Sequence, residues 1–217
     1  MNALRRIQRA KKEAILIVVL LIFYLVGICG ILSDTYTPSF LALSPFNLVL
    51  SFVIVLLARR SKRIHFMLFL IACFVIGFVV EYIGTQTGLL FGDYRYGANL
   101  GFKWMGVPLL IGINWGVLIV TAASIVNRLN ILSILQIILS ALLMVGLDFL
   151  MEPVAISSDF WSWSGGEIPF YNYTCWFFIS LFLQYLYHRF KLVESNKVFD
   201  SLFIILILFF TGLNLYS

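Results

Sequence analysis

Long apolar stretches separated by short polar segments run through most of the chain. Seven of them can be followed, at residues 14–32, 40–58, 64–83, 106–126, 131–150, 170–187 and 199–216. A helix rises about 1.5 Å per residue and the hydrocarbon core of a bilayer is about 30 Å thick, so one crossing takes about 20 residues. The pattern predicts an all-α, polytopic bundle of about seven transmembrane helices, forming a single integral membrane domain over residues 1–217.

The Lys and Arg residues set the expected orientation of this bundle. The basic segment 1–13 precedes an apolar run that is too long for a signal sequence and has no cleavage pattern after it. Further basic residues follow the second, fourth and sixth stretches: Arg59, Arg60, Lys62, Arg63, Arg128, Arg189, Lys191 and Lys197. Only Arg95 and Lys103 fall on the opposite side. The positive-inside rule predicts a multi-pass protein of the cytoplasmic (inner) membrane, with its N-terminus cytoplasmic and its C-terminus outside.

Composition agrees with a membrane protein. Hydrophobic residues make up 62% of the chain and charged residues 12%, against about 45–50% and 25% in soluble domains. The net charge of +5 follows from the orientation, so no nucleic acid partner is needed to explain it. Cys29, Cys73 and Cys175 stand singly in apolar stretches, and the two histidines lie at the edges of such stretches. Without metal-ligand spacing or a dinucleotide or phosphate-loop motif, we expect no metal and no cofactor.

Three carboxyl residues stand out, because they lie at the expected outer ends of the third and fifth stretches. Asp148 and Glu152 are four residues apart, so a continuing helix brings them within about 5–6 Å of each other. Glu81 is expected to share a helix face with Gly77, Gly84 and Gly88 and to point into the bundle. A low dielectric, a like charge and the helix C-terminus favour the neutral acid that a general acid needs. Arg95 or Lys103, if folded back, would keep one carboxylate ionised instead.

A functional role for these acids competes with a structural one. They could serve only as hydrogen-bond partners between helices, but an ionisable group inside a membrane is by default a functional candidate. Aromatic residues cluster in the two long outer connections, 84–105 and 151–169, and beside them. Such residues form interfacial belts, yet aromatic faces beside a carboxylic acid also suit a reaction through a carbocation.

The two outer regions together resemble the CruF-type carotenoid hydratases, which include bisanhydrobacterioruberin hydratase and related carotenoid 1,2-hydratases. The resemblance covers roughly residues 64–180 and is carried by EYIGTQTGLLFGDYRY (residues 81–96), Gly106-Val107-Pro108 with Trp115, Asp148–Pro153, Trp161-Ser162-Trp163, Ile168-Pro169, and Asn172-Tyr173 with Trp176. The chain departs from the family pattern in having Glu152 where an Asp precedes the proline, and Cys175 where a small residue precedes the last Trp.

What the resemblance implies is a carotenoid biosynthesis enzyme that adds water, without a cofactor, to the terminal isopropylidene double bond of an acyclic end group. We expect Asp148 or Glu152 to donate the proton, and Glu81 to act as its partner or as the base for water. The expected substrate-binding residues are Asp93, Tyr94, Tyr96, Trp104, Trp161, Trp163, Asn172 and Trp176, with Asn172 holding the water. The carotenoid, the lipid bilayer and other carotenoid pathway enzymes are the candidate partners.

Two alternatives remain open from the sequence. A membrane-helical lycopene cyclase also protonates a polyene end, and differs only in quenching the cation with a ring bond, which would make it an isomerase. A small transporter or a structural membrane protein could use Glu81 and Asp148 as a proton or ion site. The absence of inverted repeats and of paired broken helices argues against the transporter.

Overall fold

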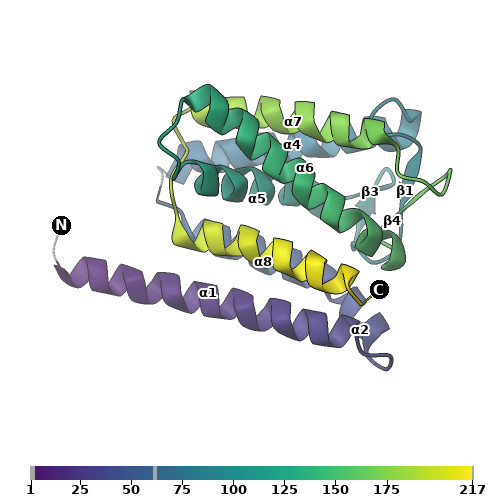
Figure 1. The fold of residues 1–217 in the computed structure, drawn as a ribbon, viewed down its shortest axis with the longest axis horizontal. Helices are drawn as coiled ribbons and strands as arrows, with labels where there is room; N and C mark the ends of the chain where they lie inside the picture. Colours follow the sequence, from purple (N-terminus) through teal and green to yellow (C-terminus); the bar gives the residue numbers. More distant parts are fainter. Residues whose placement is uncertain (1–2, 61–62, 217) are drawn as a thin grey trace.

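A computed structural model describes residues 3–60 and 63–216, which form a helical bundle (Figure 1). Its helices are α1 (Ala3–Ile31), α2 (Thr37–Ala42), α3 (Ser44–Ala58), α4 (Arg63–Thr87), α5 (Leu109–Val126), α6 (Ser133–Ser157), α7 (Phe170–Arg189) and α8 (Lys197–Asn214). Four short strands join them: β1 (Tyr94–Tyr96), β2 (Lys103–Trp104), β3 (Val107–Pro108) and β4 (Trp161–Trp163). The expectation of an all-α protein is confirmed.

Five helices of the described residues, namely α1, α4, α5, α6 and α8, are long and apolar enough to cross a membrane. The two other expected spans are α3, which is apolar but has 15 residues, and α7, which has 20 residues but carries polar side chains such as Asn172 and Gln184 along its buried face. Large apolar side chains such as Leu68, Phe182 and Leu208 are exposed on the outside of the bundle, as expected of a surface in contact with lipid.

Several helix boundaries differ from the expected ones. The stretch 40–58 is broken at Leu43 into α2 and α3. Pro45 lies in the first turn of α3, and because proline has no backbone N–H it favours the start of a new helix over the continuation of α2. Helix α6 continues past residue 150 and through Pro153 to Ser157. Gly88 does not share the α4 face with Glu81, because it follows the helix end with a positive φ of 65°.

The helices pack in an order that leaves α1 at one edge of the bundle. Helix α8 lies between α1 and the remaining long helices, and α2 and α3 pack beside α1 (Figure 1). Helices α4, α5, α6 and α7 form the other side, where α6 packs on α7 and α4 on α5. The two chain ends lie at opposite ends of the bundle (Figure 1).

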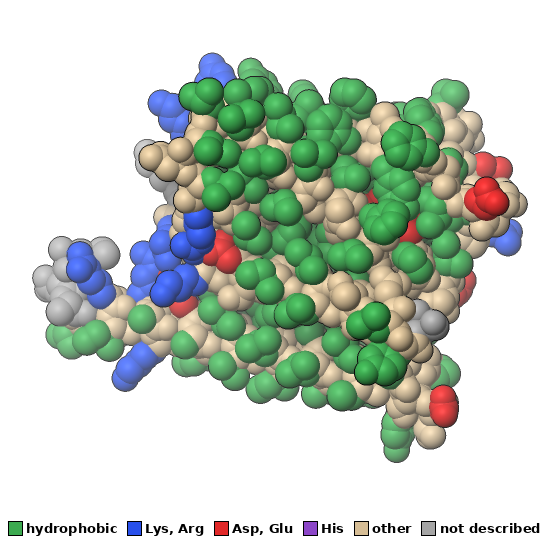
Figure 2. Space-filling view, viewed as in Figure 1, with side chains coloured by type: hydrophobic (Ala, Val, Ile, Leu, Met, Phe, Trp, Pro, Cys, Tyr) green, Lys and Arg blue, Asp and Glu red, His purple; other side chains and the backbone are tan. Residues whose placement is uncertain are grey.

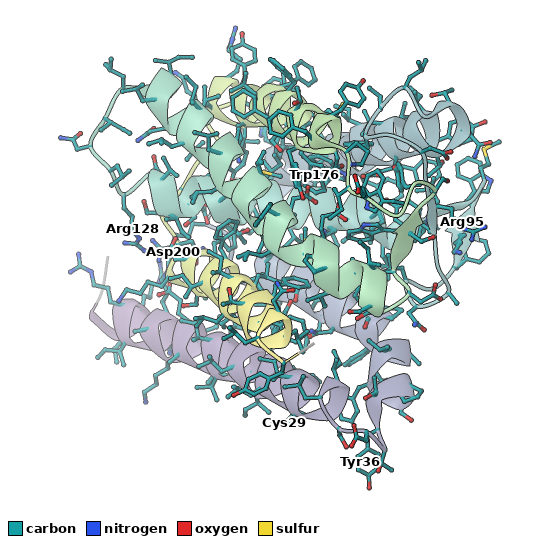
Figure 3. The ribbon with its side chains drawn as sticks, turned by 45° about the vertical axis from the view of Figure 1, so that its right-hand side comes forward. Cys29, Tyr36, Arg95, Arg128, Trp176 and Asp200 are labelled. Carbon is teal, nitrogen blue, oxygen red and sulfur yellow. The ribbon has the colours of Figure 1, made fainter. Side chains whose placement is uncertain are left out.

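Charge separates the two ends of the bundle. Lys and Arg side chains gather at the end near the N-terminus, and the opposite end carries mainly Asp and Glu (Figure 2). Ion pairs join Glu13 to Arg9 and Arg60 at the basic end, and Arg128 to Asp200 (Figure 3). Residues 1 and 2 of the basic N-terminal segment and Lys62 lie outside the described residues.

The two long connections meet at the other end of the bundle. Strand β1 pairs antiparallel with β4, so that Tyr94 lies opposite Trp163 and Tyr96 opposite Trp161. Because side chains alternate along a strand and directly opposed residues share a face, these four aromatic side chains lie on one face of the ribbon. We call this ribbon the aromatic cap.

Candidate active site

Glu81 lies near the end of α4 beneath the aromatic cap and is 4% exposed. Its Oε2 accepts hydrogen bonds from the hydroxyls of Tyr94 at 2.5 Å and Tyr96 at 2.6 Å, and its Oε1 accepts one from Nε1 of Trp115 at 3.0 Å. Burial, reinforced by the charge of Glu81, raises the pKa of both tyrosine hydroxyls, so they stay protonated and act as donors. Three donors therefore hold this carboxylate from two sides.

Glu152 has a comparable set of partners from the other strand of the cap. Its Oε2 accepts hydrogen bonds from Nε1 of Trp161 and Nε1 of Trp163, each at 2.9 Å. Its Oε1 accepts one from Nδ2 of Asn172 at 3.2 Å. Because an indole N–H only donates, Oε2 acts as an acceptor toward both rings, and this arrangement suits an ionised carboxylate.

Asp148 is bonded differently from the two glutamates. Its Oδ2 accepts a hydrogen bond from Nδ2 of Asn172 at 3.0 Å. Its Oδ1 is buried and has no hydrogen-bond partner among the described residues. The side chain of Asp148 is 0% exposed and that of Glu152 is 1% exposed. Asn172 thus joins the two acids, as their spacing of four residues on one helix allows, and Asp148 keeps one oxygen free to carry a proton.

Neither basic residue of this end reaches a carboxyl group. Nζ of Lys103 donates to the carbonyl oxygen of Tyr96 at 2.7 Å. Nε of Arg95 donates to Oγ of Ser162 at 3.4 Å, on the outer face of the aromatic cap (Figure 3). Within the described chain, the partners of the three acids are therefore uncharged donors, and neither Arg95 nor Lys103 folds back onto the site.

The three acids line one cavity of about 380 Å³, which lies within the usual range of small-molecule sites of roughly 300–1,000 Å³. All four aromatic residues of the cap line it, together with Asn172 and Trp176. The rest of the wall is largely apolar, with residues such as Phe91, Leu118, Met151 and Leu206. The site can therefore enclose an apolar group and present acids to one end of it.

Aromatic rings surround the acid end of this cavity. Trp115 and Trp176 stack with ring centroids 4.2 Å apart and an angle of 19° between the planes. Tyr94 and Trp163 lie 5.2 Å apart, and Tyr96 and Trp161 lie 6.3 Å apart. Ring faces in this position can stabilise a cation that forms beside the acids.

Two of the expected substrate-binding residues lie away from the cavity. Trp104 is 56% exposed and stacks on Phe78 with ring centroids 5.4 Å apart. Asp93 does not line the cavity, and its backbone oxygen accepts a hydrogen bond from the backbone N–H of Ser164. Both residues sit close in sequence to cap residues, but the alternation of the strands and the turn at β2–β3 direct them elsewhere.

One residue of the site was not among the expected site residues. Trp115 lies within α5, is 1% exposed, and both bonds Glu81 and stacks on Trp176. Trp115 lies in an apolar stretch without charged neighbours, so nothing in the nearby sequence indicated a role in the site. Only its part in the family motif pointed to it. Gly77 makes room for it, because a Cβ at that position would lie 2.6 Å from the indole ring.

Comparisons with known proteins point to one family. No curated protein and no solved structure matches the chain. The sequence model described as carotenoid biosynthesis protein matches residues 43–216, a range that includes every residue bonded to the three acids. The chain therefore belongs to the carotenoid biosynthesis protein family.

Proposed function

We propose that this protein adds water to the terminal isopropylidene double bond of an acyclic carotenoid end group and produces a tertiary alcohol. The observation that carries the proposal is the difference between the acids. Glu81 and Glu152 are each held by three uncharged donors, whereas Asp148 has a free buried oxygen at the wall of an apolar cavity. An acid and a fixed carboxylate are the two groups that acid-catalysed hydration needs.

In the proposed reaction Asp148 carries the proton on its free oxygen. It transfers this proton to the CH carbon of the double bond, and the positive charge forms on the carbon that carries the two methyl groups, which then bears three carbon substituents. The stacked rings of Trp115 and Trp176 and the cap aromatics line the space around this cation. These rings and the hydrogen-bond donors around the acids are already in position, so they act without having to reorganise during the step.

Water then attacks the cation and forms the new C–O bond. Glu152 is placed to accept the proton that the water loses, since its carboxylate shares Asn172 with Asp148. Both hydrogens of the Asn172 side chain are used on the acids, which leaves its carbonyl oxygen to accept a hydrogen bond from the water. One H and one OH are added to the substrate, and a proton passed from Glu152 back to Asp148 restores the starting state.

Glu81 is assigned a supporting role in this scheme. Its carboxylate holds Tyr94, Tyr96 and Trp115 in place by hydrogen bonds. Its negative charge lies on the same cavity wall as the rings and favours a cation there.

The placement of the protein in the membrane belongs to the same proposal. Seven helices run back and forth between the two ends of the bundle, and the termini lie at opposite ends (Figure 1). This arrangement supports seven crossings, by α1, α3, α4, α5, α6, α7 and α8. The concentration of Lys and Arg at the end near the N-terminus supports a cytoplasmic location for that end (Figure 2). The acid site then lies near the outer face of the inner membrane.

Expression in a bacterium that makes lycopene tests the proposed reaction. Chromatography with mass spectrometry should show a product heavier by one water, and Asp148→Asn should abolish it while the protein accumulates in the membrane as before. An isomeric cyclic product would identify a cyclase instead. Unchanged pigments with several acyclic carotenoids, or full activity of both Asp148→Asn and Glu152→Gln, would refute the proposal.

A further inference from the structure

The cavity extends well beyond the acids. From the aromatic cap it continues past Leu118 of α5 and Phe209 of α8 to the helices at the edge of the bundle. There its wall is formed by residues of α1, α2 and α3 and by Leu43 between α2 and α3. The acid site and the edge of the bundle therefore share one continuous space.

At this edge the cavity reaches the outside of the bundle. Most lining residues are buried or half-buried, and four are exposed: Phe23 at 41%, Val26 at 51%, Leu43 at 54% and Phe46 at 53%. All four lie on α1, on α3 or between α2 and α3. They are apolar, and they adjoin the exposed apolar surface of the bundle. We call this place the lateral opening.

Glycines on α1 shape the lateral opening. At Gly30 the ring of Phe40 from α2 occupies the space that a side chain would fill. At Gly27 an added Cβ would lie 3.4 Å from the ring of Phe209. Phe23 and Phe46 approach each other across the rim with ring centroids 5.9 Å apart. Small residues on α1 thus leave room for rings from α2 and α8, and for the cavity between them.

We infer that the lateral opening is where the polyene chain of the substrate passes between the acid site and the lipid. This inference rests on the proposed function for the identity of the occupant. Apart from Tyr24, Ser44 and Asn47, the wall near the opening is apolar and suits a hydrocarbon chain. A cavity of about 380 Å³ is small for a whole carotenoid, so it encloses the end group and the adjoining segment. The remaining chain then lies outside, against Phe23 and Phe46.

A photo-cross-linking amino acid in place of Phe46 tests this route directly. The matched control carries the same group in place of Phe178, which is 61% exposed on α7, away from the cavity lining. Irradiation of membranes containing a coloured acyclic carotenoid should attach several-fold more pigment to the Phe46 variant. Equal attachment at both positions would overturn the inference.

A second pair of variants measures the same route through product formation. Gly27→Leu places a bulky side chain at the opening, whereas Gly146→Leu places it on α6, where nothing lies within 4 Å. Conversion should fall several-fold in the first variant and stay unchanged in the second. Equal conversion by both would overturn the inference even if hydration were established. Pigment attached at position 46 without any hydrated product would sustain the route and refute the proposed reaction.

Discussion

The two indole donors on Glu152 give a quantitative test of the acid site. Trp161→Phe and Trp163→Phe each remove one N–H···O bond of 2.9 Å while keeping an aromatic ring in the cavity wall. A hydrogen bond to a charged group contributes about 1.5–3 kcal/mol. If the transition state depends on the Glu152 carboxylate, each substitution should lower the hydration rate roughly ten- to hundredfold, at about 1.4 kcal/mol per factor of ten.

The assay is the initial rate of hydrated product in membranes, normalised to the amount of enzyme. Trp104→Phe is the matched control, since Trp104 is exposed and packs on Phe78 outside the cavity. In a Glu152→Gln background, Trp163→Phe should have little further effect, because residues that act through one group are not additive. Normal rates in both cap variants, or an equal loss in Trp104→Phe, would refute the role given to Glu152.

Two further predictions concern the surroundings of Glu81. Tyr94→Phe and Tyr96→Phe each remove one hydrogen-bond donor to Oε2 of Glu81. The double variant should therefore lose more activity, and more thermal stability in detergent, than either single variant. A double variant no worse than one single variant would contradict the shared role of the two tyrosines. Gly77→Ala places a Cβ 2.6 Å from Trp115 and should lower the free energy of unfolding by about 1–3 kcal/mol. Thermal unfolding measures this loss, with Gly146→Ala as the control variant. Equal stabilities of the two variants would contradict the tight packing at Gly77.

Sequence reasoning reached the parts of the site that depend on local geometry. The spacing of Asp148 and Glu152 was sufficient to predict their proximity, because the helix repeat fixes it. The inward direction of Glu81 followed from its glycine neighbours in the same way, although Gly88 turned out to end the helix. The apolar stretches predicted the helices themselves, since each one had to satisfy its backbone internally.

Features that depend on contacts between distant residues could not be predicted in this way. The pairing of β1 with β4 joins residues 67 positions apart, as the bond between Arg95 and Ser162 illustrates. Two strands of three residues each give too little pattern to fix a register. That register decides which aromatic residues of the cap point to the acids, whereas the exposed Trp104 lies on β2, outside this ribbon. The role of Trp115 depends equally on a neighbour in another helix.

The chemistry and the proposed access route use different parts of the chain, and this separation can be measured. The hydrogen-bond donors to the acids come from α5, α7 and the aromatic cap, whereas the lateral opening lies on α1, on α3 and between α2 and α3. Gly27→Leu should therefore change the ratio of conversion between two acyclic carotenoids of different chain length. Trp163→Phe should lower both conversions by the same factor, because it acts after the end group has entered. If Trp163→Phe changed the ratio and Gly27→Leu did not, the assignment of the two regions would be wrong.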